Sequence, residues 1–351
     1  MEKSEVVGLK LSQKEGVLIS DKFDRRYYSG VDIDEGYLLI SKHPAYFTDS
    51  RYFYALKEML KESDITPVLY TGLDSVKKYL KEKKIKKLFI DYRKTTIKEG
   101  QDFKKLKVKI RDASAFLEKG RAVKNQSEIE KISTACKIIE SAVSNAIKKL
   151  KVGVTENEIR ESIIKSIKKA GGEGESFSTI VAFGKNSAVP HHQTGETKLQ
   201  KDSAVLIDTG AVYKGYCSDI TRTVFFGKPS EKFIKAYDAV KTANERVIEN
   251  IAVGTSYSSA DALAREVLEE HDLDKYFTHG LGHGLGLEIH EFPTLSKRGV
   301  GEIKENDAFT IEPGVYFDGE FGIRIEDTVV VENGKIKRLF SDEKELLLIE
   351  E

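Results

Sequence analysis

The feature that most constrains the fold of this chain is an internal repeat in its C-terminal two thirds. Two segments, 135–155 and 236–256, match at a constant offset of 101 residues, and each carries a Val-Gly pair near its end. Their apolar residues recur at the spacing of an amphipathic helix. The similarity continues into two strand-like segments, 201–210 and 305–314. A repeat that covers helix and strand alike predicts a duplicated α+β domain with pseudo-twofold symmetry.

Acidic residues occupy matching places in the two halves of this repeat. When the two halves are aligned, Asp208 in the first strand matches Glu312, and Asp219 in the second strand matches Glu326. Chance similarity between amphipathic helices does not explain why acids fall at equivalent strand positions. The repeat therefore predicts four carboxylates that meet near the pseudo-twofold axis.

The first half also predicts a β-hairpin with a two-residue loop at Lys214-Gly215. This loop pairs Asp208 with Thr221 and turns the side chains of Asp208 and Asp219 to one face, since side chains alternate along a strand. Two carboxylates that close repel each other unless a cation lies between them. Hard divalent cations prefer such oxygen ligands. The alternative interpretation is a solvated pair of acids at the edge of a hairpin.

The hairpin of the second half does not follow the same rule. A two-residue loop at Asp318-Gly319 would turn Glu326 to the face opposite to Glu312, because a shift of one residue reverses the face of every side chain. We therefore expect a bulge or a loop of odd length between these two acids.

Histidines lie close to the acidic strands in the sequence. His279, His283 and His290 occur in a glycine-rich segment, and glycine lets a backbone approach a ligand or another strand closely. The glycine spacing is not that of a dinucleotide-binding loop. His191 and His192 lie on a predicted loop. An isolated histidine is more often structural, but histidines combined with four acids suit one or two divalent ions of manganese, cobalt, iron or zinc.

The N-terminal third has a different organisation, in which short apolar runs alternate with helical segments. This pattern predicts a separate α/β layer domain over 1–120, followed by a second domain over 121–351. We expect strands at 16–20, 36–41 and 86–91, helices at 50–61 and 75–84, and a surface turn at 24–30.

Composition excludes several classes of function. Lys plus Arg and Asp plus Glu both number 57, so the net charge gives no reason to expect a nucleic-acid partner. No apolar run reaches 18 residues, and we expect no membrane span. The first ten residues do not read as a secretory signal. Cys136 and Cys217 form neither a CxxC motif nor a disulfide framework, so we expect a reducing, cytoplasmic location.

With these residues assembled, the chain resembles the pita-bread metallopeptidases. This group includes Xaa-Pro aminopeptidase, Xaa-Pro dipeptidase (prolidase) and methionine aminopeptidase. The resemblance spans roughly 120–350 and rests on the segments IDTGAVYKGYCSDITRT, THGLGHGLGLEIHEFP, FTIEPGVYF and GIRIEDT. It implies an α/β N-terminal domain of the creatinase/prolidase type joined to an α+β pita-bread domain with an internal pseudo-twofold repeat. The N-terminal domain favours the Xaa-Pro branch.

The resemblance also implies a dinuclear metal site. The ions are expected to be manganese or cobalt, with zinc or iron as alternatives. Asp219 and Glu326 would bridge them, Asp208 would complete one ion, and His283 with Glu312 would complete the other.

The same resemblance assigns roles in catalysis. His192, His290 and Glu312 would act on the reacting groups, and His279 and Arg324 would contact the substrate, with Thr221 supporting the ligands. The implied reaction is hydrolysis of the N-terminal Xaa-Pro bond of short proline-containing peptides by a hydroxide that the two ions share. The implied assembly is a homodimer.

One departure and two alternatives remain. Thr294 stands where many prolidases carry an arginine for the carboxylate of a dipeptide, which keeps longer Xaa-Pro peptides open. Methionine aminopeptidase activity is the alternative chemistry, since HEFP at 290–293 resembles the His-Glu-x-Pro stretch of those enzymes. A non-catalytic peptide-binding protein of the same fold is the alternative from another class, although such relatives typically lose several ligands.

Overall fold

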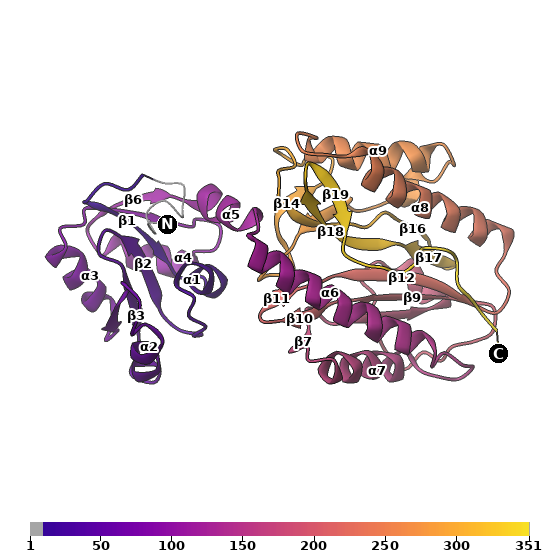
Figure 1. Ribbon diagram of the computed structural model, residues 1–351, viewed down its shortest axis with the longest axis horizontal. Coiled ribbons are helices and arrows are strands. Elements are labelled where there is room, and N and C mark those ends of the chain that lie inside the picture. The colour runs from indigo at the N-terminus through magenta and orange to yellow at the C-terminus, as the bar shows by residue number, and fades with distance from the viewer. Residues whose placement is uncertain (1–9, 351) are drawn as a thin grey trace. The chain divides into compact units, whose positions relative to one another are not determined.

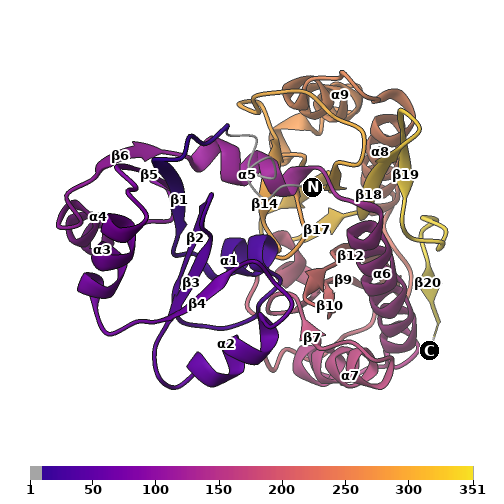
Figure 2. The ribbon, with the colours of Figure 1, turned by 60° about the vertical axis from the view of Figure 1, so that its left-hand side comes forward.

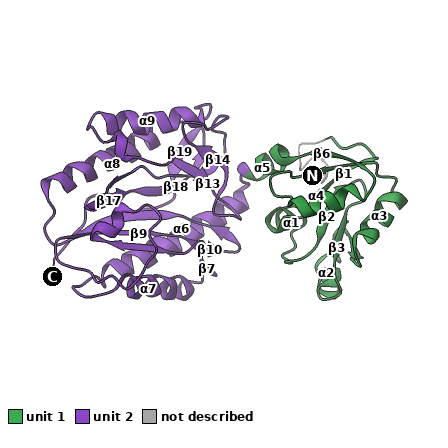
Figure 3. Cartoon of the chain, turned by 180° about the vertical axis from the view of Figure 1, so that it is seen from behind, with its two compact units in different colours: residues 1–121 green, residues 122–351 purple. Residues whose placement is uncertain are grey.

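The computed structural model describes residues 10–350, which form two compact units that divide after Arg121 (Figure 3). The boundary expected from the sequence, after residue 120, is adjacent to this division. Unit 1 has one sheet with a hydrophobic cluster on each face, and unit 2 has its own sheets and its own hydrophobic core.

Unit 1 is built on a six-stranded mixed sheet (Figure 1). The strands β1, β2 and β5 correspond to the three predicted from apolar runs. In spatial order the strands are β4 (Thr66–Leu69), β3 (Ala45–Thr48), β2 (Tyr37–Ser41), β1 (Glu15–Ile19), β5 (Lys87–Ile90) and β6 (Lys109–Asp112).

Both faces of this sheet are buried, because successive side chains of β1 enter different cores. Val17 and Ile19 join the core that α1, α2 and α5 cover, whereas Leu18 joins the core beneath α3 and α4. The predicted helices at 50–61 and 75–84 correspond to α2 and α3. The helices are α1 (Lys22–Ser29), α2 (Phe53–Met59), α3 (Leu73–Glu82), α4 (Ile97–Lys104) and α5 (Ser114–Ala122).

The surface turn predicted at 24–30 was wrong, since residues 24–29 belong to α1 and Gly30 is its C-cap. Asp21 caps the helix by accepting a hydrogen bond from the backbone of Asp24, and Gly30 ends it with a φ of 74°. Arg25 is buried, and its guanidinium donates to the carbonyl oxygens of Ile33 and Asp34. These tertiary bonds make burial of so polar a helix possible, and local sequence does not reveal them.

Unit 2 contains a nine-stranded sheet whose order displays the predicted pseudo-twofold symmetry. The β12–β18 pair joins the halves where Thr221 pairs with Glu326. Beyond β12 lie β9 and β8, and beyond β18 lie the matching β15 and β13, with β14 as an additional edge strand. In order they are β14 (Glu291–Leu295), β13 (Gly282–Gly284), β15 (Ala308–Ile311), β18 (Glu326–Glu332), β12 (Ile220–Phe226), β9 (Ser203–Thr209) and β8 (Ile180–Phe183), with β19 (Lys335–Arg338) on β18 and β20 (Leu348–Ile349) on β12.

The repeated helices form two pairs, and the two helices of each pair lie side by side (Figures 1 and 2). Short 3-10 helices and two small sheets complete the unit. The pairs are α6 (Gln126–Ile147) with α7 (Glu156–Lys169), and α8 (Glu231–Asn250) with α9 (Tyr257–Glu269); the 3-10 helices are η1 (Gly184–Ala188) and η2 (Asp274–Tyr276); the small sheets consist of β7 (Gly174–Glu175), β10 (Ala211–Tyr213) and β11 (Tyr216–Cys217), and of β16 (Gly314–Phe317) and β17 (Phe321–Arg324).

The two hairpins differ in loop length, and this difference lets the acids of each half share a face. Tyr213 pairs with Tyr216, which confirms the two-residue loop of the first half, and Asp208 pairs with Thr221. In the second half Phe317 pairs with Phe321, so the loop at 318–320 has three residues. This odd length keeps Glu312 and Glu326 in register. Their side chains therefore share a face without the bulge that a two-residue loop would have required.

None of the helices formed by residues 10–350 combines the length and apolar character that crossing a membrane requires.

Candidate metal centre

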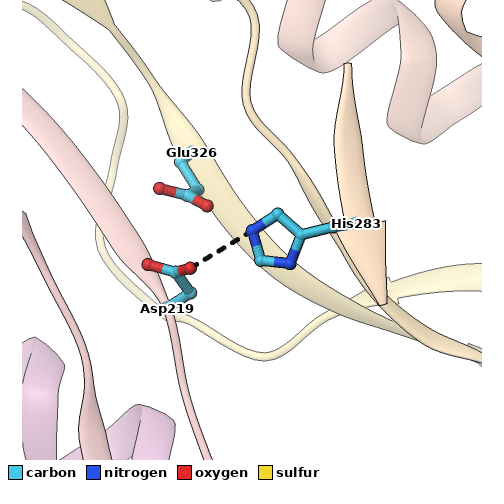
Figure 4. Close-up of side chains that lie close together, drawn as sticks. All are labelled: Asp219, His283 and Glu326. Carbon is cyan, nitrogen blue, oxygen red and sulfur yellow. Dashed lines mark ion pairs between the residues drawn. The ribbon is translucent and has the colours of Figure 1, made fainter. Parts of the chain in front are cut away.

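The two halves of unit 2 bring five side chains of metal-ligand type to one cavity of about 320 Å³. Asp208 belongs to β9 and His283 to β13, Asp219 precedes β12, Glu312 follows β15, and Glu326 begins β18. Figure 4 shows three of them, which converge from different strands. The paired acids of the repeat thus meet where the halves join.

The distances within this set match those of a shared ligand site. One ligand atom each from Asp219, His283 and Glu326 lie within 4.8 Å of one another. The Nε2 atom of His283 is 3.5 Å from Oδ2 of Asp219 and 3.5 Å from Oε1 of Glu312. These separations leave room for a cation between the atoms rather than direct hydrogen bonds.

The buried carboxyl groups of the cavity would be stabilised by positive charge. Burial raises the pKa of Asp219 well above its usual range, and the charges of Glu326 and Asp208 raise it further. Burial likewise raises the pKa of Glu326, with added repulsion from Glu312. Burial also raises the pKa of Glu312 itself, to about 7. Carboxylates that cannot all ionise together are stabilised when a cation lies among them.

Two further observations fit a divalent cation. The Oδ1 atom of Asp219 is buried and accepts no hydrogen bond from the part of the chain that the structure describes. A buried carboxylate oxygen without a partner is strongly destabilising unless it binds an ion. His283 has the form of a ligand, because burial lowers its imidazole pKa and its Nδ1 lies 3.1 Å from the Gly284 carbonyl oxygen. A proton on Nδ1 leaves the lone pair of Nε2 directed at the acids.

Arg324 lines the cavity, but its guanidinium already binds other side chains of the site, and its contact with a substrate stays a prediction. Its Nη2 donates to Oδ2 of Asp208 over 2.6 Å, and its Nε donates to the Thr221 hydroxyl over 3.0 Å. Thr221 in turn donates to Oε2 of Glu326 over 2.6 Å. Arg324 therefore contacts two carboxylates of the predicted ligand set, Asp208 directly and Glu326 through Thr221.

His279 lines the cavity, but other groups of the protein occupy both of its ring nitrogens. Nδ1 lies 2.8 Å from the Gly280 carbonyl oxygen, and Nε2 lies 2.9 Å from the Tyr316 hydroxyl. The Tyr316 hydroxyl also accepts a hydrogen bond from Arg324. Burial lowers the pKa of His279 to about 4, so the ring is neutral, and its predicted contact with substrate would not use its nitrogens.

His191 takes the place that the sequence analysis gave to His192. His191 lines the cavity, whereas Nε2 of His192 lies 2.9 Å from the buried carboxylate of Glu156 on α7. Adjacent histidines on a loop point in different directions, and their sequence does not show which one faces the site. The assignment of His192 was therefore wrong.

His290 lines the cavity, and its ring centroid is 4.3 Å from that of His283. Its catalytic role stays a prediction. Sequence reasoning missed two residues that organise the site. Tyr316 links Arg324 to His279, and the Thr310 hydroxyl accepts from the backbone of His283 and lies 3.2 Å from Oε1 of Glu312, to which it donates. Thr310 lies two positions before Glu312, so strand alternation was a usable signal for it.

Comparison with known proteins places this arrangement in a class. The chain belongs to the metallopeptidase family M24, whose model matches residues 130–333, and residues 9–123 match the creatinase/prolidase N-terminal domain. The family match confirms the predicted two-part architecture and a metallopeptidase that uses divalent metal ions.

Individual proteins resemble the chain over nearly its whole length. It is 35% identical to the Xaa-Pro dipeptidase of Pyrococcus horikoshii, covering 95% of this chain and 94% of that protein. Among solved structures, the Xaa-Pro dipeptidase from Bacillus anthracis has 34% identity, a TM-score of 0.94 and 99% coverage of both chains. The X-Pro aminopeptidase from Thermotoga maritima has 32% identity, a TM-score of 0.88 and 95% coverage of both.

Proposed function

We propose that this protein is an exopeptidase that hydrolyses the N-terminal Xaa-Pro bond of short peptides. The observation that carries the proposal is the convergence of five ligand-type side chains on one cavity, in a chain similar over nearly its full length to proteins named for this activity. The residues that would hold the ions are Asp208, Asp219, His283, Glu312 and Glu326, and Asp219 and Glu326 would be common to both ions. We propose manganese or cobalt, because both suit mixed carboxylate and imidazole ligands, with zinc or iron as alternatives.

Bound divalent ions supply a water of lowered pKa and polarise the scissile carbonyl. Glu312 would accept a proton from the attacking water and return it to the proline nitrogen as the C–N bond breaks. His191 and His290 would donate hydrogen bonds to the carbonyl oxygen as it gains negative charge. Arg324 and Thr221 would keep the ligand carboxylates in place during the reaction.

The cavity also bears on peptide length. Among the described residues that line it, Arg324 is the one Lys or Arg side chain, and its guanidinium already binds Asp208, Thr221 and Tyr316. With Thr294 at the wall, we propose that no lysine or arginine of this cavity holds the C-terminal carboxylate of a dipeptide and that longer peptides are accepted as well. Hydrolysis of Ala-Pro against Ala-Pro-Pro with manganese or cobalt measures this preference, and Met-Ala-Ser tests the methionine aminopeptidase alternative.

Removing a proposed bridging carboxylate tests the function. Asp219→Asn and Glu326→Gln are each expected to abolish metal-dependent hydrolysis of Ala-Pro-Pro, because the lost charge would weaken both ions. Asp318→Asn, in the exposed hairpin loop, is the matched control and should keep full activity. Near wild-type turnover in both ligand variants would overturn the proposal. Metal absent after reconstitution would favour a binding protein instead.

We further propose a homodimer in the cytoplasm. The dimer rests on resemblance to a family that is commonly dimeric. The location is supported by Cys136 and Cys217, which are both buried free thiols. Sedimentation of the purified chain and fractionation of its host cells test the two statements.

A further inference from the structure

A charged network lies behind the metal centre, on the opposite face of the sheet. Glu326 and its hydrogen-bonded neighbour Thr221 lie on the cavity side of β18 and β12. The next residue on each strand, Asp327 and Arg222, projects to the other side because side chains alternate. Both are buried, and Nη2 of Arg222 donates to Oδ1 of Asp327 over 2.8 Å.

Two members of this network hold the main chain beside the proposed ligands. Nη1 of Arg222 donates to the carbonyl oxygens of Thr221 at 2.9 Å and Glu326 at 2.6 Å. On α8, the fully buried amide of Asn244 donates to the carbonyl oxygens of Ile311 at 2.9 Å and Ile325 at 3.3 Å. Ile311 and Ile325 directly precede Glu312 and Glu326 in the sequence.

The C-terminal segment, which we define as 339–349, closes this network. Nζ of Lys344 donates to Oδ1 of Asn244 over 2.6 Å and is 3.4 Å from Oδ2 of Asp327. Oδ1 of Asp342 accepts from Nη2 of Arg222 over 2.8 Å. The segment ends in β20, which pairs with β12, the strand that follows Asp219. Its charged side chains therefore contact the groups that hold the ligand strands from behind.

We propose that the C-terminal segment is a positioning element for the metal ligands and acts through Lys344 and Asp342. Buried charges must be paired, so undocking the segment would leave Arg222 and Asp327 without part of their neutralising charge. These groups would then shift, and with them the main chain beside Glu312 and Glu326. Loss of a direct partner of a metal ligand typically lowers metal affinity or activity 10- to 100-fold, and Lys344 acts one contact further out, so we expect a loss at the low end of this range. The inference rests on the proposed metal site.

The test is a calorimetric titration of the metal-free full chain with Mn²⁺ alone. Lys344→Met removes the charge and keeps most of the side-chain length, and we expect about a 10-fold loss of Mn²⁺ affinity. Lys344→Arg should restore most of it. The matched control is Lys241→Met on α8, which removes the 2.6 Å ion pair with Glu345 of the same segment but does not reach the ligand strands. Its Mn²⁺ affinity should be unchanged.

Each outcome decides the inference. Circular dichroism first shows that the metal-free variants are folded at the temperature of the titration. Where Lys344→Met does not fold, Asp342→Asn at the more exposed end of the network becomes the deciding variant. Its Mn²⁺ affinity is likewise expected to fall. Unchanged affinity in the deciding variant, or an equal loss in Lys241→Met, overturns the inference while the proposed function stands. Where the wild-type chain binds no Mn²⁺, the same titrations use Co²⁺, Zn²⁺ and Fe²⁺, and a wild-type chain that binds none of the four ions overturns both.

Discussion

At the scale of single residues, Glu312 connects the metal site to stability. Burial raises its pKa from 4.5 to about 7, so the folded metal-free protein binds this proton more tightly than the unfolded chain does. The contribution of Glu312 to stability is therefore lost as the pH rises from about 4.5 through about 7. The bound cation would offset this effect, because it stabilises the ionised carboxylate.

Glu312→Gln should reveal that contribution. In chelator, the variant is expected to be about 1–3 kcal/mol more stable than the wild type at pH 8, with a much smaller difference at pH 5. Denaturant unfolding at the two pH values measures both differences. Comparison at fixed pH cancels the titration of other groups, such as His279. An equal difference at both pH values would contradict the assigned pKa direction.

The two adjacent histidines predict opposite phenotypes. His191→Ala should lower kcat for Ala-Pro-Pro at least about 10-fold with unchanged Mn²⁺ affinity, because it removes a donor near the reacting carbonyl. His192→Ala should keep kcat but lower the free energy of unfolding by about 1–2 kcal/mol, because buried Glu156 loses one partner. Steady-state kinetics and denaturant unfolding of both variants separate these effects, and a reversal of the phenotypes would restore the original assignment of His192.

At the scale of elements, close approach of strands places His283. A Cβ atom on Gly282 would overlap the carbonyl oxygen of Thr310, so only glycine lets β13 lie this near β15. The expectation that the glycine-rich segment serves a close backbone approach agrees with this contact.

Gly282→Ala should therefore push β13 away from β15 and carry His283 with it. We expect a loss of about 1–3 kcal/mol in stability together with weaker Mn²⁺ binding. Gly195→Ala is the control, since its added Cβ would meet its nearest neighbour at 3.8 Å, an ordinary contact. Thermal unfolding and Mn²⁺ titration of the two variants test this account. Wild-type Mn²⁺ affinity in Gly282→Ala would show that the strand spacing does not position the histidine.

Element pairing also shows what sequence could and could not provide. The two-residue loop at Lys214-Gly215 was predictable because its glycine and flanking alternation are local signals. The three-residue loop at 318–320 was predictable only as one of two solutions, a loop of odd length or a bulge, from the requirement that Glu312 and Glu326 share a face. Its position at the tip depends on the pairing of Phe317 with Phe321, which the local sequence leaves open.

At the scale of the whole molecule, the repeat carried most of the predictive power. Duplication tied acids far apart in sequence to one place, and the strand order of unit 2 agrees with it. What failed depended on tertiary contacts. Helix α1 is polar in sequence, yet it buries Arg25, which donates to backbone carbonyl oxygens outside the helix. The ion pair between Arg324 and Asp208 was not predicted either, because it depends on how two distant strands pack. Side-chain direction within a loop, as for His191 and His192, was likewise beyond pattern reasoning.

The most direct test of the central claim is a crystal structure of the protein soaked in Mn²⁺, with anomalous scattering used to locate the ions. We expect two strong peaks in the cavity of unit 2, both within bonding distance of Asp219 and Glu326, one also near Asp208 and the other near His283 and Glu312. The same five side chains around solvent alone, with no anomalous peak, would contradict it.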